Sequence, residues 1–239
     1  MERIEHTTLP VEVILLIARL LEPWDLVNLA IAIPGIDRLY KPKYWVSIRD
    51  REGNTMLHIC AANQLDNFIV SLAEKKFDIH TTNHIGYTAL HNACKAGRES
   101  SARFLLDAGL DPNVPAVGGT IALHLAVSRG ELSTIRLLIK RRADISARTS
   151  GGYTALHWAV DSRNCDVAAL LVSGGAEVDQ QDNFGRTPLH WAAWQGNEAT
   201  EGFERIVPCL GGVGGSGVVR LLRTIKYYFT HYVGISVGR

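Results

Sequence analysis

Residues 86–91 read Gly86-Tyr87-Thr88-Ala89-Leu90-His91, and residues 185–190 read Gly185-Arg186-Thr187-Pro188-Leu189-His190. This six-residue pattern decides the fold, because it recurs at a fixed spacing. Its histidine returns at equal intervals along the chain, at His58, His91, His124, His157 and His190. Five in-phase copies predict an array of structural repeats over residues 50–200.

Each unit reads as a turn followed by two helices. The glycine five residues before each histidine suits a turn, the threonine three before it suits a helix N-cap, and Pro188 suits a first helical position. Leucines of the second helix recur at the same interval as the histidines, at Leu72, Leu105, Leu138 and Leu171. One unit cannot cover its own apolar face, so stacking must supply the core. Each buried leucine should contribute roughly 1.5–3 kcal/mol.

The repeated Gly-x-Thr-x-Leu-His pattern resembles the ankyrin signature in both residues and period. This resemblance implies an all-α repeat fold, a solenoid of helix-turn-helix units joined by β-hairpin-like turns. We expect five repeats, at 50–82, 83–115, 116–148, 149–181 and 182 to about 214, the last one irregular. In the third repeat Ile121 replaces the threonine and Arg142 stands where a glycine usually follows the second helix, so we expect it to be looser locally.

Residues 6–46 form a separate segment with a helical pattern of its own. Pro10 suits a helix start, and Pro23 followed by Asp25 separates a first amphipathic helix from a second. This order of elements resembles an F-box, a family in which the segment binds the SKP-type linker of a cullin–RING ubiquitin ligase and downstream repeats capture the substrate. The resemblance places five residues at or under the linker-binding face: Leu9, Pro10, Ile14, Ile17 and Leu20. The alternative is a simple helical cap over the first apolar face of the stack.

Residues 201–239 break the repeat. In register, the core positions of the last second helix would hold the charged residues Glu201, Glu204 and Arg205, whose unpaired burial is strongly unfavourable. The glycine-rich run 211–217 lacks the lysine of a phosphate loop, so we expect a linker there. We interpret residues 201–217 as an interruption of the fifth repeat, followed by a basic amphipathic tail helix. A membrane-surface helix is the alternative for that tail.

Composition limits the function classes. Hydrophobic residues make up 46% and charged residues 21% of the chain, which is typical of a globular protein. The net charge of +1 gives no reason to expect nucleic acid as a partner. The four cysteines form no C-x-x-C pair, which indicates reduced thiols of an intracellular protein, cytoplasmic or nuclear. We expect no signal peptide, because the N-terminal apolar run has no basic flank and no small-residue cleavage site. We expect no membrane span, because no stretch approaches roughly 20 uninterrupted apolar residues. We also expect no cofactor, metal or catalytic residue, because the repeat histidines stand one to a unit and bond locally and there is no cofactor loop or nucleophile–base pair.

The concave face of such a stack is the expected binding surface for a partner protein. Three kinds of position face this concave surface: the first residue after each histidine, the fourth residue after each histidine, and the turn tips. We expect partner contacts at Tyr87, Asn92, Lys95, Leu125, Ser128, Tyr153, Trp158, Asp161, Arg186, Trp191 and Trp194. Aromatic side chains are enriched in binding hot spots, which favours the fourth and fifth repeats. The alternative is that the three tryptophans pack on one another and stiffen the stack.

The sequence therefore predicts a protein–protein interaction module and not an enzyme. The preferred hypothesis is an F-box-type substrate adaptor of a ubiquitin ligase, with the ankyrin repeats as the substrate-binding surface. The alternative is an ankyrin scaffold or inhibitor protein whose N-terminal helices only cap the stack.

Overall fold

The recurring Leu-His pair lies in the first turn of a helix in each repeat of the computed structural model. The structure describes residue 25, residues 49–74 and residues 78–196. Apart from Asp25, the F-box-like segment 6–46 lies outside the described residues, and so do the tail 201–239 and its expected linker and helix.

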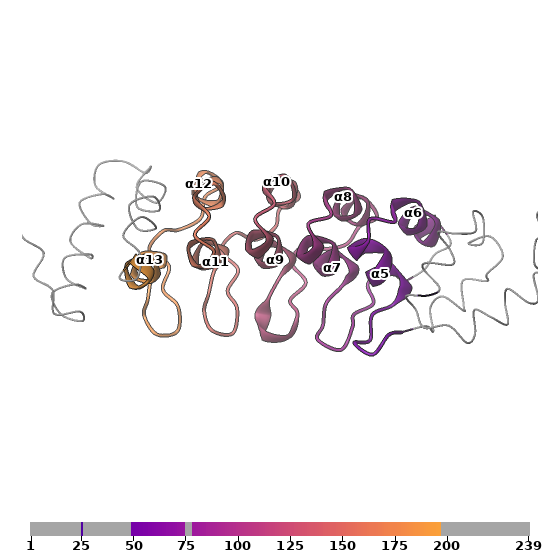
Figure 1. Cartoon of the computed structure of the whole chain (residues 1–239), viewed down its shortest axis with the longest axis horizontal. Coiled ribbons are helices and arrows are strands. Elements are labelled where there is room, and N and C mark those ends of the chain that lie inside the picture. The colour runs from indigo at the N-terminus through magenta and orange to yellow at the C-terminus, as the bar shows by residue number, and fades with distance from the viewer. Residues whose placement is uncertain (1–24, 26–48, 75–77, 197–239) are drawn as a thin grey trace, which may run out of the picture.

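Each repeat contributes an inner helix, and the first four also show an outer helix. The inner helices are α5 (Met56–Ala62), α7 (Ala89–Ala96), α9 (Ala122–Arg129), α11 (Ala155–Asp161) and α13 (Pro188–Gly196). The outer helices are α6 (Asp66–Glu74), α8 (Glu99–Asp107), α10 (Leu132–Lys140) and α12 (Cys165–Ser173). Figure 1 shows two rows of helices, with the turns projecting below the inner row. Each inner helix packs against its neighbours in the row, and the first four also pack against the outer helix that follows.

The core lies between the two rows of helices. Leu57, Leu90, Leu123 and Leu156 of the inner helices are at most 1% exposed, and the outer-helix leucines at the repeat spacing are at most 3% exposed. Alanines such as Ala93 and Ala126 are fully buried and let neighbouring inner helices approach closely. The predicted leucine core is confirmed. Among the described residues, no helix is long and apolar enough to cross a membrane.

The turns form five hairpin-like segments, which we call fingers 1 to 5: residues 49–54, 82–87, 115–120, 148–153 and 181–186. A backbone bond closes each finger, as from Asp50 N to Asn54 O at 3.0 Å and from Ala116 N to Thr120 O at 2.8 Å. The repeat glycine takes a left-handed φ in every finger, between 73° and 80°. Finger 3 also holds a short 3₁₀ helix, Val117–Gly119. Residues 49–74 and 78–196 contain no β-strand beyond an isolated bridge between Arg49 and Thr55, so the described fold is helical with hairpin-like turns.

Backbone hydrogen bonds join each finger to the next. His84 N donates to Glu52 O at 3.0 Å, and Val117 N donates to Ile85 O at 2.9 Å. In the same way, Ser150 N of finger 4 donates to Gly118 O of finger 3 at 2.7 Å, and Asn183 N of finger 5 donates to Gly151 O of finger 4 at 3.1 Å. This ladder fixes the spacing of the fingers, because each bond connects neighbouring finger tips.

The repeat histidines join neighbouring units as well. His58 Nδ1 accepts the Thr55 N–H at 3.2 Å and lies 2.7 Å from Thr55 Oγ1, while His58 Nε2 bonds the Tyr87 carbonyl oxygen at 2.7 Å. Since Nδ1 accepts a backbone N–H, the proton of the neutral ring sits on Nε2. His91 and His157 repeat this arrangement, with carbonyl distances of 3.3 Å and 3.1 Å. The sequence predicted local bonds only, whereas the structure adds a bond to the following repeat.

The third repeat keeps both helices but lacks two of these polar contacts. Ile121 supplies only its backbone N–H to His124 Nδ1, at 3.2 Å, because its side chain has no hydroxyl. His124 Nε2 is buried without a regular hydrogen bond. Arg142 adopts φ 63°, a left-handed conformation that glycine adopts in the neighbouring repeats. In repeat 3 the histidine Nε2 thus lacks the carbonyl bond that His58, His91 and His157 make.

Candidate functional site

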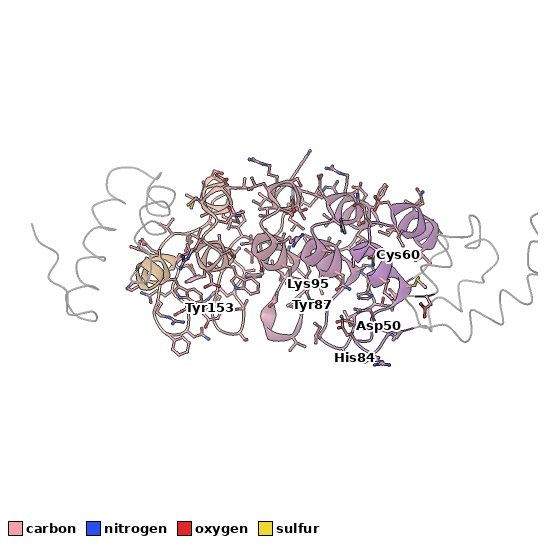
Figure 2. All side chains as sticks on the ribbon, viewed as in Figure 1. Asp50, Cys60, His84, Tyr87, Lys95 and Tyr153 are labelled. Atoms are coloured by element: carbon pink, nitrogen blue, oxygen red, sulfur yellow. The ribbon has the colours of Figure 1, made fainter. Side chains whose placement is uncertain are left out.

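The inner helices and the fingers together form one side of the stack, which we call the inner face. Its side chains come from the first and fourth positions after each histidine and from the fingers. Figure 2 shows Tyr87 and Lys95 close together, with Asp50 and His84 toward the finger side. Adjacent repeats therefore contribute jointly to any site on this face.

A hollow of about 420 Å³ opens on the inner face between the first two repeats. Its apolar lining consists of Ile59, Ala62, Ile85, Tyr87 and Ala96. Its polar lining consists of Asp50, Glu52, Asn54, Asn83, Asn92 and Lys95. This volume falls within the range of roughly 300–1,000 Å³ that is usual for ligand-binding clefts.

Three asparagines form the polar floor of the hollow. Asn54 Oδ1 accepts Asn83 Nδ2 at 2.8 Å and Asn92 Nδ2 at 3.3 Å. Asn83 Oδ1 accepts the backbone N–H groups of Ile85 and Tyr87, so Asn83 holds finger 2 in shape. Asn92 makes one long side-chain bond among the described residues, which leaves an amide N–H and its oxygen available to a ligand.

The charged groups of the hollow come from different repeats: the carboxylates of Asp50 and Glu52 from finger 1, and the ammonium of Lys95 from α7. Asp50 Oδ1 accepts the backbone N–H groups of Glu52 at 2.9 Å and Asn54 at 2.8 Å, so Asp50 is committed to finger 1. Glu52 is exposed and holds Asn54 Nδ2 at 3.2 Å through one carboxylate oxygen. In the second repeat, Lys95 Nζ lies 5.8 Å from the ring centroid of Tyr87. The Tyr87 ring in turn stacks on His91, with centroids 5.1 Å apart.

At two positions of this face the first repeat carries smaller side chains than the fourth repeat. Asn54 occupies the position that Tyr87 and Tyr153 fill in the second and fourth repeats. In the fourth and fifth repeats, Trp158 and Trp191 occupy the position of Ile59. Large aromatic rings thus fill the space that the first repeat leaves free.

Trp191 of the fifth repeat is part of a packed cluster. Trp191 Nε1 donates to Asp182 Oδ2 at 3.1 Å, and the Trp191 ring meets Tyr153 edge-on with centroids 5.0 Å apart. Arg186 Nε bonds the same carboxylate oxygen at 2.7 Å, and its guanidinium lies 5.1 Å from the Trp191 ring. Burial alone would raise the pKa of Asp182, but hydrogen bonds from Arg186, Phe184 and Trp191 lower it below its ordinary value. The cluster joins fingers 4 and 5 and α13.

The remaining predicted contacts are distributed along the inner face. Trp158 is half-buried, with its ring 5.5 Å from that of His124. Leu125 is only 7% exposed and belongs to the core, so it offers little surface to a partner. Ser128 and Asp161 are exposed, and the side chain of Trp194 lies outside the described residues. Trp158 and Trp191 pack on histidine and tyrosine rings, and this packing favours a stiffening role for these two tryptophans.

A family model for ankyrin repeats, in three copies, matches residues 25–116 and 123–203, more than half of the chain. The chain belongs to the ankyrin-repeat family. Ankyrin repeats mediate the binding of protein partners, which indicates that the stack is a protein–protein interaction module. The match begins at residue 25, inside the segment 6–46 that resembles an F-box. No curated relative matches the chain.

Within the ankyrin stack, the structure unites three predicted site residues, Tyr87, Asn92 and Lys95, in one hollow. Sequence reasoning did not single out Glu52 or Ile85 on the fingers. The repeat register could have identified Glu52 and Ile85. It aligns finger 1 with finger 2 and shows that the first repeat carries smaller side chains. The five F-box-like residues Leu9, Pro10, Ile14, Ile17 and Leu20 lie outside the described residues.

Four of the five ankyrin histidines, His58, His91, His124 and His157, are buried, and burial lowers the pKa of each below its ordinary value. Burial lowers the pKa of His91 to about 4, against an opposing hydrogen bond to the Thr120 carbonyl. Burial likewise lowers the pKa of His124 to about 4. Among the described residues, no three His, Cys, Asp or Glu side chains gather as metal ligands would.

The two most buried thiols of the stack are chemically unreactive. Cys60 and Cys94 are free and buried, and burial raises the pKa of each to about 12. A thiol with so high a pKa remains protonated at neutral pH and is a poor nucleophile. Cys165 is free and partly exposed, and Cys209 lies outside the described residues.

Proposed function

We propose that the ankyrin stack captures a protein substrate on its inner face and that the chain is an F-box-type adaptor of a cullin–RING ubiquitin ligase. In this proposal the N-terminal segment 6–46 holds the SKP-type linker through Leu9, Pro10, Ile14, Ile17 and Leu20. The substrate-binding part is supported by the hollow between the first two repeats, whose charged and polar groups have spare bonding capacity. The ligase part is supported by the F-box resemblance of the sequence.

Site-specific photo-crosslinking tests the substrate-binding part. A photoreactive amino acid at Lys95, inside the hollow, should crosslink a partner protein in intact cells. The matched control places the same amino acid at Arg136, which is exposed on the outer helix α10. A crosslinked band of equal strength from both positions, or from Arg136 alone, would contradict the inner face as the binding surface.

A pull-down with purified SKP-type linker tests the ligase part. The intact chain should retain the linker, and Leu9→Asp or Ile14→Asp should abolish retention, because a carboxylate in an apolar interface is left unpaired. Ser133→Asp is the matched control, since it adds the same charge on the exposed side of α10. If the intact chain retains no linker, the adaptor role is wrong.

The second candidate is an ankyrin scaffold or inhibitor whose N-terminal helices only cap the stack. It is favoured by one observation, namely that the ankyrin match already begins at residue 25. A cap predicts that Ile14→Asp and Leu20→Asp lower the stability of the repeats without affecting any linker. Chemical denaturation of these variants, alongside the pull-down, separates the two candidates.

A further inference from the structure

The hollow between the first two ankyrin repeats has three chemically different walls, and their arrangement indicates what it accepts. The apolar wall is formed by Ile59, Ala62, Ile85 and Tyr87. Ile85 is 47% exposed although it is a large aliphatic residue, so this wall is open to a ligand. An apolar side chain from outside would gain burial here without displacing any buried group.

The charged walls have different capacities for a partner. Asp50 already accepts three hydrogen bonds within finger 1, from Glu52 N, Asn54 N and Asn54 Nδ2. One carboxylate oxygen of Glu52 accepts a hydrogen bond from Asn54, and the Glu52 side chain is exposed. Glu52 is therefore the carboxylate that can pair with an incoming cation. Lys95 makes no ion pair with the described residues and contacts the Tyr87 ring, so its ammonium can pair with an incoming anion.

We propose that this hollow receives a segment of the partner protein in which an aliphatic side chain stands between a basic and an acidic residue. The inference rests on the proposed substrate-binding function and names the chemistry that this function recognises. The aliphatic side chain packs against Ile85 and Ile59, the basic residue meets Glu52, and the acidic residue meets Lys95. The spare amide of Asn92 bonds the backbone of the bound segment. Charge complementarity across the hollow sets the direction in which the segment runs.

A protein segment suits the site better than a small metabolite. The hollow is shared by two fingers and two inner helices. Val117 of finger 3 lies outside its lining and is 72% exposed. Val117 N bonds the Ile85 carbonyl oxygen, so these two aliphatic residues sit on neighbouring finger tips. An extended polypeptide can follow this edge, whereas a small molecule would leave it uncovered.

Fluorescence anisotropy with labelled synthetic peptides tests the inference on the full chain. Each 13-residue peptide holds one leucine between an arginine and a glutamate in a serine–alanine background. The charges stand one, two or three residues from the leucine, in both orders. We expect one order to bind, and Leu→Ser in that peptide should weaken binding at least tenfold. Glu52→Lys or Lys95→Glu alone should weaken it roughly fivefold, since an exposed pair contributes modestly.

The charge-swapped double variant, Glu52→Lys with Lys95→Glu, makes the test specific. It should prefer the opposite order of charges in the peptide. The matched control exchanges the charges of the Glu99–Arg103 pair on α8, away from the inner face, and should leave the preference unchanged. Ala62→Trp imitates the large residue at the same register in repeat 5, fills the hollow and should abolish binding. Circular dichroism verifies that each variant is folded.

Two outcomes would overturn the inference. One is that no peptide binds, and the other is that the preferred order survives both the charge swap and Ala62→Trp. The photo-crosslink at Lys95 then decides the wider proposal. If a partner is crosslinked at Lys95 but no peptide is preferred, the substrate-binding function is supported and the proposed segment chemistry is wrong. If neither a crosslinked partner nor a peptide preference is found, both the substrate-binding function and the proposed segment chemistry are wrong.

Discussion

Acid should destabilise the stack through its buried histidines, and the size of the effect follows from two of them. His91 and His124 are 1% and 0% exposed, and burial lowers the pKa of each from 6.5 to about 4. Protonation would also place a hydrogen on Nδ1, which accepts a backbone N–H in both cases. The folded state therefore requires neutral rings.

The sign of the pH dependence follows from proton linkage. Between pH 6.5 and pH 4 the unfolded chain binds more protons than the folded chain, so stability rises with pH in this window. The contribution is fully present above pH 6.5, is lost as the pH falls toward 4, and changes little below that. Folded and unfolded pKa values of 4 and 6.5 correspond to about 2 kcal/mol lost per histidine between pH 7 and pH 5.

Together His91 and His124 should lower the free energy of unfolding by about 4 kcal/mol at pH 5, a large part of the net stability of a small domain. Burial also lowers the pKa of His58, His157 and His190, which act in the same direction. Urea denaturation followed by circular dichroism at pH 7.5, 6, 5 and 4.5, at constant ionic strength, measures the loss.

Replacement of one histidine identifies the source of this pH dependence. His91→Gln should be less stable at pH 7.5 but should lose about 2 kcal/mol less than the parent between pH 7 and pH 5. His80→Gln is the matched control, because His80 is exposed in the connection before finger 2. Unchanged stability from pH 7.5 to 4.5, or an unaltered slope in His91→Gln, would refute the reasoning.

Three further substitutions test the structure in denaturation experiments at neutral pH. Arg142→Gly should raise the free energy of unfolding by about 0.5–1 kcal/mol, because φ 63° strains any residue with a Cβ; Arg142→Ala should not. Gly152→Ala should lower it by about 2 kcal/mol, because a Cβ there would lie 2.7 Å from Asn183 N on the next finger; Gly109→Ala, with open space around its Cβ, should lower it less. Trp191→Ala should lower it by about 2–3 kcal/mol, since the ring packs on Tyr153 and bonds Asp182. If Trp191→Ala changes stability no more than an ordinary surface substitution does, this ring is free for a partner instead.

The row of histidines and the leucine core could be predicted from the sequence, because both depend on periodicity. His91 follows Thr88 by three residues in the same helical turn, so their contact is local. Leu105 and Leu138 recur at the repeat spacing, and burial of any one implies burial of the others. The inter-repeat bond from His58 to the Tyr87 carbonyl was not predicted, because it joins two different repeats and depends on how they dock.

The sequence by itself determined the repeat, its register and the side of each helix that faces the core, since each follows from spacing along one chain. Only the tertiary structure decided where the inner face is open. Aromatic residues drew attention to the fourth and fifth repeats, but there Trp191 is held by Asp182, Arg186 and Tyr153. The hollow lies at the first two repeats, because its volume depends on the difference in side-chain size between stacked neighbours. That difference becomes a cavity only when the units are packed side by side.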